Sequence, residues 1–160
     1  MMTTGLEPRE FTWVIARRLA VSERIGGYGF QHRRVRREEE IAWLRATGVN
    51  AVLTLLEGNQ NIAAYEEAGM VAVNEPLVEL TPAGVLRVLA TMSSLLSDPH
   101  RVLLLHRDIV DDTLAGVLAG FLVHSGKVAD PIAATVLIQE ILKRPLGPEA
   151  RAIIPMTTGA

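Results

Sequence analysis

The side chains best suited to chemistry gather in one short stretch, which begins at His106 and ends at Thr113. A strongly apolar run, residues 101–106, leads into it, and a small apolar segment, residues 113–124, follows it. This order predicts a buried strand, a polar loop and a buried helix. The loop offers side chains that could ligate a metal ion or exchange a proton, namely His106, Asp108, Asp111 and Asp112.

The composition removes several kinds of chemistry from consideration. None of the 160 residues is cysteine, which excludes a thiol nucleophile, a disulfide and a thiolate metal site. The net charge of −2 gives no overall attraction to nucleic acid. No apolar stretch reaches the roughly 18 residues of a membrane span, and the N-terminus lacks the apolar middle region of a secretory signal. We therefore expect a cytoplasmic protein.

The acidic residues of the loop have two interpretations. Asp111, Asp112 and Thr113 suit the first turn of a helix, so they could cap the helix that follows and fill a site where an anion would otherwise bind. The alternative is a metal site formed by His106, Asp108 and the next two aspartates. Ligands this close in sequence rarely all converge on one ion, and no second cluster supports them. We expect no metal and no cofactor.

Apolar runs alternate along the chain between strand-like and helix-like patterns. Strands are predicted at residues 12–16, 19–21, 51–56, 70–73 and 101–106. Helices are predicted at residues 38–46, 61–68, 81–96, 113–124, 131–143 and 148–153, and a Gly-rich surface loop at 25–30. This alternation predicts an α/β fold, a single domain over residues 11–155 with a mostly parallel central sheet flanked by helices. Residues 1–10 and 156–160 are expected to be flexible ends.

In this order of elements the chain resembles the protein tyrosine and dual-specificity phosphatases, in their small bacterial form. Residues 11–15 and 19–22 are similar to the amino-terminal strands of that family, and residues 41–55 to its helix, Gly turn and second strand. Residues 75–79 are similar to the loop that usually holds an acid, and residues 102–123 to its strand, active loop and helix. The resemblance implies a fold of the cysteine-phosphatase kind, in which ligands bind beyond the carboxyl ends of the strands.

In that family the active loop reads His-Cys, five residues, Arg, and then Ser or Thr. The Cys attacks phosphorus as a thiolate, the Arg holds two phosphate oxygens, and loop N–H groups face the anion at a helix N-terminus. Here His106 matches, but Arg107 stands at the position of the Cys and Thr113 at that of the Arg. A register with one deletion places Asp112 at the Arg position instead. Neither register supplies the catalytic Arg.

The resemblance thus implies that the catalytic machinery is lost. Glu79 lies near the position of the family's general acid, but without a nucleophile it has nothing to assist, and we expect it to be solvated. The three aspartates of the loop would also oppose a phosphate, since two unit charges about 4 Å apart repel by roughly 4 kcal/mol at an effective dielectric of about 20. We expect His106 to hold the loop in place. We expect Arg107 to form an ion pair, with Asp108, Asp111 or Glu79.

A dense basic segment lies beside the Gly-rich loop, and it contains Arg33, Arg34, Arg36 and Arg37. Pairs four residues apart on a helix, such as Arg36 with Glu40, would stabilise the start of the next helix. The alternative is that this segment docks an acidic protein partner. A homo-oligomer is a further possibility.

These observations lead to one functional hypothesis and two alternatives. We expect a pseudophosphatase, that is, a catalytically inactive phosphatase-like protein with a binding or regulatory role. The first alternative is a hydrolase of another type that uses the acidic loop as a metal or acid/base site. The second is a structural or interaction subunit whose partner surface is residues 25–37.

Overall fold

The structure, a computed structural model, describes residues 5–58 and 61–158. These residues form two compact units, which we describe separately. The sheet unit comprises the chain up to residue 76 together with residues 95–110, and the helical unit comprises residues 77–94 and the chain from residue 111. None of the described helices is long and apolar enough to cross a membrane.

The sheet unit is built on five strands in the order β1-β2-β5-β3-β4. Only β1 and β2 are antiparallel, and the other neighbours are parallel. The strands are β1 (Thr12–Ile15), β2 (Leu19–Ser22), β3 (Ala51–Thr54), β4 (Val71–Asn74) and β5 (Leu103–His106). All four residues of β2, β3 and β5 are buried, because these strands occupy the middle of the sheet. The predicted, mostly parallel α/β fold is confirmed.

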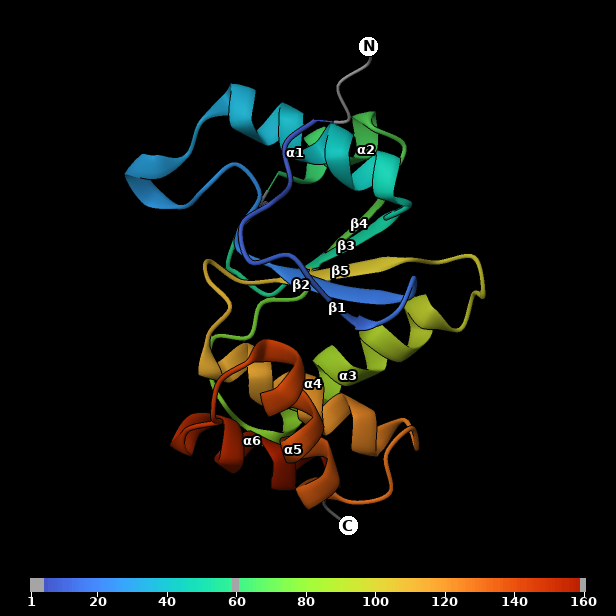
Figure 1. Ribbon diagram of the computed structural model, residues 1–160, viewed down its shortest axis with the longest axis vertical. Coiled ribbons are helices and arrows are strands. Elements are labelled where there is room, and N and C mark those ends of the chain that lie inside the picture. The colour runs from blue at the N-terminus through green and yellow to red at the C-terminus, as the bar shows by residue number, and fades with distance from the viewer. Residues whose placement is uncertain (1–4, 59–60, 159–160) are drawn as a thin grey trace. The chain divides into compact units, whose positions relative to one another are not determined.

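Two helices cover one face of this sheet, α1 (Arg34–Thr47) and α2 (Ile62–Glu67), and Figure 1 shows them together on that side. Ala20, Val52 and Leu104 lie side by side on β2, β3 and β5, so their side chains point to the same face. They form one buried cluster with residues of α1 and α2, including Ile41, Leu44, Tyr65 and Met70. This cluster is the core of the sheet unit.

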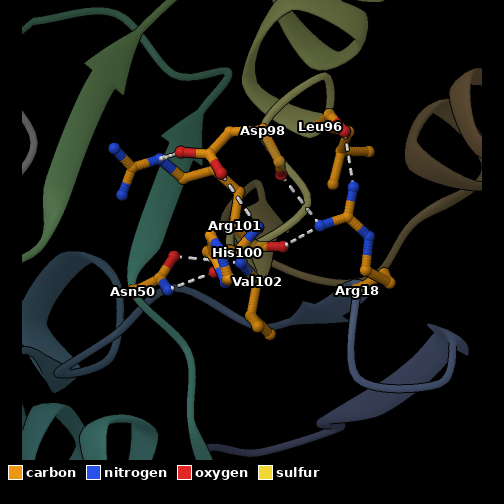
Figure 2. Close-up of polar contacts among 7 residues, drawn as sticks. All are labelled: Arg18, Asn50, Leu96, Asp98, His100, Arg101 and Val102. Carbon is orange, nitrogen blue, oxygen red and sulfur yellow. Dashed lines mark hydrogen bonds and ion pairs between the residues drawn. The ribbon is translucent and has the colours of Figure 1, made fainter.

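The amino-terminal edge of the sheet is held by a network of polar contacts, drawn in Figure 2. The Arg18 guanidinium donates to the carbonyl oxygens of Leu96, Asp98 and Arg101. The Asn50 amide donates to the carbonyl of His100 at 2.7 Å and its oxygen accepts from the N–H of Val102 at 2.9 Å. These contacts fix the turn that leads into β5.

The helical unit contains α4 (Asp112–His124), α5 (Pro131–Leu142), α6 (Pro148–Thr158) and most of α3 (Pro82–Leu96). Both α5 and α6 pack against α4, and the packing of α6 on α4 is the more extensive. A Cβ atom at Gly116 would lie 2.8 Å from the Cα of Ala150, and one at Gly120 would lie 2.5 Å from the Thr157 side chain. Glycine at these two positions lets the helices meet.

The elements agree with the predictions to within a few residues, with two larger corrections. The helix predicted at 38–46 begins at Arg34, because the ion pairs Arg34–Glu38 and Arg36–Glu40 stabilise a first turn that has no apolar periodicity. The helix predicted at 148–153 continues to residue 158, because Ile154 and Thr157 are buried in its second half.

The expected flexible ends lie partly outside the described residues. Within the described part, the N–H of Leu6 donates to the carbonyl of Glu39 at 3.0 Å, and α6 extends through Thr158. Flexibility of the ends therefore stays a prediction.

Candidate functional site

A row of polar residues marks the carboxyl-terminal edge of the sheet. Ser22, His106, Thr54 and Asn74 end the four parallel strands and lie side by side in register. Ser22, Thr54 and His106 are fully buried. In open α/β sheets this edge is where ligands bind, so the row places the candidate site at its expected location.

His106 is neutral in this row. Its Nδ1 lies 3.0 Å from the carbonyl oxygen of Arg107, and because a carbonyl only accepts, this nitrogen carries the hydrogen. Burial lowers the pKa of His106 to about 4, since the charged imidazolium would lose its hydration. The hydrogen bond to the loop gives His106 the structural role that was predicted for it, while Nε2 is a buried acceptor with no hydrogen bond in the described chain.

Asp108 is held by Arg24, which follows β2. The guanidinium Nη1 lies 3.7 Å from Oδ1 of Asp108, and the N–H of Arg24 donates to the Asp108 carbonyl at 3.1 Å. Sequence reasoning considered Arg107 as the partner of this aspartate and missed Arg24. The available signal was topological, because parallel pairing of β2 with β5 brings the residues that follow each strand together.

The Gly-rich loop was predicted to be a surface loop, but its first half is buried and firmly anchored. The N–H of Gly26 donates to Oε1 of Glu40 at 2.7 Å, and Oε2 of the same carboxylate accepts from Arg36 Nε at 2.9 Å. Gly26 has φ +86°, and a Cβ atom there would lie 2.9 Å from His32 Nε2, so only glycine fits. The predicted Arg36–Glu40 pair is confirmed, and it has a second function because the buried Glu40 also holds this loop.

Several side chains of the sheet unit have buried polar atoms that make no hydrogen bond within the described chain. These atoms are Arg24 Nε, His32 Nε2, Arg37 Nε, Thr54 Oγ1, Tyr65 OH, His106 Nε2 and Asp108 Oδ1. Native interiors leave few such atoms unpaired, so their concentration here indicates a place that binds water or a polar ligand.

The ionisation of this cluster suits binding more than nucleophilic chemistry. Burial raises the pKa of Tyr65 far above its usual value, so the phenol stays protonated. Burial and the nearby Arg24 lower the pKa of His32. The cluster therefore offers neutral imidazoles, a phenol and guanidinium donors, and none of these is an activated nucleophile.

The second half of the loop belongs to the helical unit, where its acidic residues cap helices. Asp111 Oδ1 accepts from the N–H of Leu114 at 2.9 Å, which confirms for Asp111 the predicted cap of α4. Asp112 instead caps α6, because its two oxygens accept from the N–H groups of Gly147 at 2.8 Å and Ala150 at 2.9 Å. Thr113 donates to Oε2 of Glu149 at 3.1 Å. These side chains tie the start of α4 to the start of α6.

The alternative metal site receives no support from this arrangement. Within residues 5–58 and 61–158, no group of three or more histidine, aspartate or glutamate side chains is placed to hold an ion. Both oxygens of Asp112 already bind backbone N–H groups. Glu79, near the predicted position of a general acid, is an exposed residue of the helical unit whose carbonyl accepts from the N–H of Thr81 at 3.0 Å.

The four arginines beside the Gly-rich loop are not equivalent. The Arg36 side chain is only 15% exposed and is paired with Glu40. Arg37 is half-buried and reaches Asn61 at 3.4 Å. Arg33 and Arg34 are exposed, and Arg33 also donates to the carbonyl oxygens of Phe30 and His32. The basic surface available to a partner is therefore smaller than the sequence indicates.

No family model and no curated protein matches this sequence. Solved structures of phosphatases do match its fold. Kinase associated phosphatase, solved with its catalytic cysteine replaced by serine, has a TM-score of 0.73 and 13% identity over 92% of each chain. Tk-PTP in its active form has a TM-score of 0.70 and 15% identity, and the match covers 92% of this chain and 95% of that one.

A third match is a putative phosphatase of the DUF442 group from Shewanella putrefaciens CN-32. Its TM-score is 0.64 at 14% identity, over 94% of this chain and 92% of the other. At such identities the likeness establishes the fold alone, and it does so along nearly the whole chain. The protein therefore has the α/β fold of the protein tyrosine and dual-specificity phosphatases, and the fold that the sequence resemblance implied is confirmed.

Proposed function

We propose that this protein is a pseudophosphatase, a catalytically inactive member of the phosphatase fold that acts by binding. One observation carries the proposal: the segment that joins β5 to α4 has Arg107 where the fold's enzymes have cysteine, and the chain contains no cysteine elsewhere. Phosphoryl transfer through a cysteinyl intermediate needs a thiolate. Without one, this route is closed.

The use of the loop aspartates supports the same conclusion. In an active phosphatase the N–H groups at the start of the helix bind the substrate phosphate. Here the carboxylate of Asp111 accepts one of these hydrogen bonds, from the N–H of Leu114. The Asp111 carboxylate thus accepts a hydrogen bond that a substrate phosphate would otherwise accept. Because Asp111 belongs to the same chain, it makes this bond without the translational entropy cost of binding a separate anion.

The binding surface that we propose is the loop between β2 and α1, residues 23–33, which Figure 1 shows in blue projecting at the left of the sheet unit. Phe30 lies on this loop and is fully exposed, with Arg33 and Arg34 next to it. An aromatic side chain beside arginines is the composition typical of interface hot spots. The partner that fits this surface is an acidic protein with an apolar pocket. The absence of cysteine is consistent with binding in the reducing environment of the cytoplasm.

The test of catalytic inactivity is an assay of purified protein with p-nitrophenyl phosphate and with phosphotyrosine peptides. We expect no turnover above a buffer control. The double variant Arg107→Cys, Thr113→Arg rebuilds the motif and should also stay inactive, because Asp108 would raise the pKa of a neighbouring thiol. Vanadate-sensitive turnover by the wild type would contradict the proposal.

Turnover by the double variant alone has a narrower meaning. It would show that two substitutions account for the loss and that the acidic loop adds no barrier. For the binding role, a co-purifying protein that is lost with both Phe30→Ala and Arg33→Glu would support the proposed surface. Its retention by both variants would exclude that surface.

A further inference from the structure

The helical unit carries a groove that none of the interactions described above uses. It lies between α5 and α6, and its volume is about 360 Å³. Both helices pack on α4, so the groove runs between two neighbouring helices on a common support. We call it the α5–α6 groove. The lining residues that matter for its chemistry are Ile132, Val136, Gln139, Arg151, Ile154 and Pro155.

The walls of the groove are apolar and partly open to solvent. Ile132 and Val136 lie one helical turn apart on α5 and are 79% and 47% exposed. Ile154 of α6, only 3% exposed, forms part of the buried floor, and the ring of Pro155 lies beside it in the lining. Apolar surface gathered in a groove in this way, instead of scattered over a surface, is typical of an interaction site.

Gln139 and Arg151 present unused hydrogen-bond donors to the groove. Gln139 Oε1 accepts from the N–H of Leu146 at 2.9 Å, and Arg151 Nε donates to the Leu146 carbonyl at 3.0 Å. These two bonds anchor both side chains to the backbone of Leu146, between α5 and α6. In the described part of the chain, the amide nitrogen of Gln139 and the terminal nitrogens of Arg151 have no acceptor. Arg151 is also the single charged residue among those that line the groove.

We propose that the α5–α6 groove binds an amphipathic helical segment of a partner protein that presents two apolar side chains one turn apart and an Asp or Glu facing Arg151. The apolar pair matches the spacing of Ile132 and Val136, and the carboxylate supplies the acceptors that Gln139 and Arg151 lack. A helix between two helices is a common packing arrangement and a recurring mode of peptide recognition.

A small amphipathic molecule fits these observations less well. Small-molecule sites enclose most of their ligand, whereas Ile132 stands at the rim with most of its surface in solvent. An exposed rim residue of this kind contributes when a larger surface closes over it. The occupant that we infer is therefore a protein segment.

The test uses three fluorescent peptides of about 16 residues, long enough to form a helix. The first carries two Leu one turn apart and a Glu on the next turn, the second has Lys in place of the Glu, and the third has Ala in place of both Leu. We expect saturable binding of the first peptide by fluorescence anisotropy, binding of the second weaker on the order of tenfold, and no saturation with the third.

Variants of the protein assign the binding to the groove. Arg151→Glu should reverse the preference, so that the Lys peptide binds more tightly than the Glu peptide. Ile132→Asp should abolish binding of both. Val35→Asp is its matched control, because Val35 is also the second residue of a helix and is 71% exposed. Arg87→Glu on exposed α3 surface controls for the charge change.

Three results would overturn the proposal. The first is equal binding of the Glu and Lys peptides, or none by either. The second is an equal loss of binding in the Val35→Asp and Ile132→Asp proteins. The third is displacement of the Glu peptide by octanoate at concentrations comparable to the peptide's own, which would identify a small carboxylate as the occupant. Thermal melts of each variant test for misfolding, which we do not expect because all four substituted positions are exposed.

Discussion

The two edges of the sheet differ in how many of their polar groups are hydrogen-bonded. At the amino-terminal edge, Arg18 donates to three carbonyl oxygens and Asn50 uses both its donor and its acceptor (Figure 2). At the carboxyl-terminal edge, buried atoms of Arg24, Thr54 and His106 have no partner in the described residues. The same four-residue strands join the two edges, so the difference does not come from the strands.

This difference separates stability from binding capacity. A hydrogen bond made on folding stabilises the native state modestly, whereas a buried polar group without a partner costs free energy. Unpaired buried polar groups at the ligand-binding edge of an α/β sheet can bond a ligand, but they lower the stability of the protein without it. We therefore expect substitutions at the amino-terminal edge to be destabilising and several at the carboxyl-terminal edge to be neutral. The following predictions test that expectation, beginning with the largest effect.

The largest effect should come from protonation of His106. Burial lowers its pKa to about 4 in the folded protein, against about 6.5 when unfolded. The unfolded state therefore binds more protons between these values, and stability falls as the pH drops through that window. The His106 contribution should be complete above about pH 6.5 and should fall by roughly 3 kcal/mol by pH 4.

The measurement is a series of urea melts of wild type and His106→Asn between pH 7 and pH 4. Asparagine keeps a donor for the Arg107 carbonyl but does not titrate, so the variant should lose less stability over this range. His100→Asn is the matched control, because it makes the same substitution at an exposed histidine. Parallel pH profiles for wild type and His106→Asn would mean that His106 is not buried as a neutral group.

The second effect is at the amino-terminal edge, where Arg18→Met keeps the apolar stem and removes the three hydrogen bonds. We expect a loss of about 2–3 kcal/mol, because carbonyl oxygens of three residues lose a charged donor. The neighbouring Arg17→Met is the control, since Arg17 is exposed. An Arg18 variant as stable as its control would show that water replaces the network, and the contrast between the edges would then be weaker than we state.

The third effect concerns the aspartates that follow the carboxyl-terminal edge in the chain. Asp112→Ala removes acceptors from two backbone N–H groups at the start of α6, and should cost about 2 kcal/mol. Asp111→Ala removes an ordinary helix cap and should cost about 1 kcal/mol, as should Asp130→Ala, which caps α5. Urea melts of the three variants give the order, and a smaller effect for Asp112 than for the other two would contradict the assigned role.

Local pattern was sufficient to predict the elements that these edges join. Apolar runs located β3 and β5, Gly48 ended α1 in the left-handed conformation, and Thr81 capped α3 as expected. Each of these signals acts within a few residues of the chain. For that reason the sequence alone located the loop of interest and the fold that carries it.

The partners of individual side chains were less accessible, because they depend on contacts between distant segments. Asp112 was identified as a helix cap, but the helix that it caps is α6, which begins just after Gly147, 35 residues away. Arg24 was missed as the partner of Asp108. No sequence pattern predicted that the buried Glu40 would accept a hydrogen bond from the Gly-rich loop. Pairing rules for parallel strands predict which loops meet, but not which side chains within them bond.

The smallest effect should come from Thr54→Val, and it tests the comparison most directly. Thr54 ends β3, and Asn50 directly precedes the same strand. The buried Thr54 hydroxyl has no partner in the described chain, so valine of the same shape should change stability by less than about 0.5 kcal/mol, or increase it. Asn50→Ala, at the other end of this strand, should cost about 1–3 kcal/mol because it leaves a carbonyl and an N–H unpaired.

Urea melts of these two variants measure both edges on one strand. A cost above about 1.5 kcal/mol for Thr54→Val would mean that the hydroxyl makes a hydrogen bond in solution. The acceptor closest in register is His106, whose Nε2 is also unpaired among the described residues, and a bound water could join the two. In that event the His106→Asn variant should remove most of the cost of Thr54→Val, because the acceptor would already be gone. If the cost persists in the double variant, the hydroxyl has a different partner, and the two edges are equally satisfied.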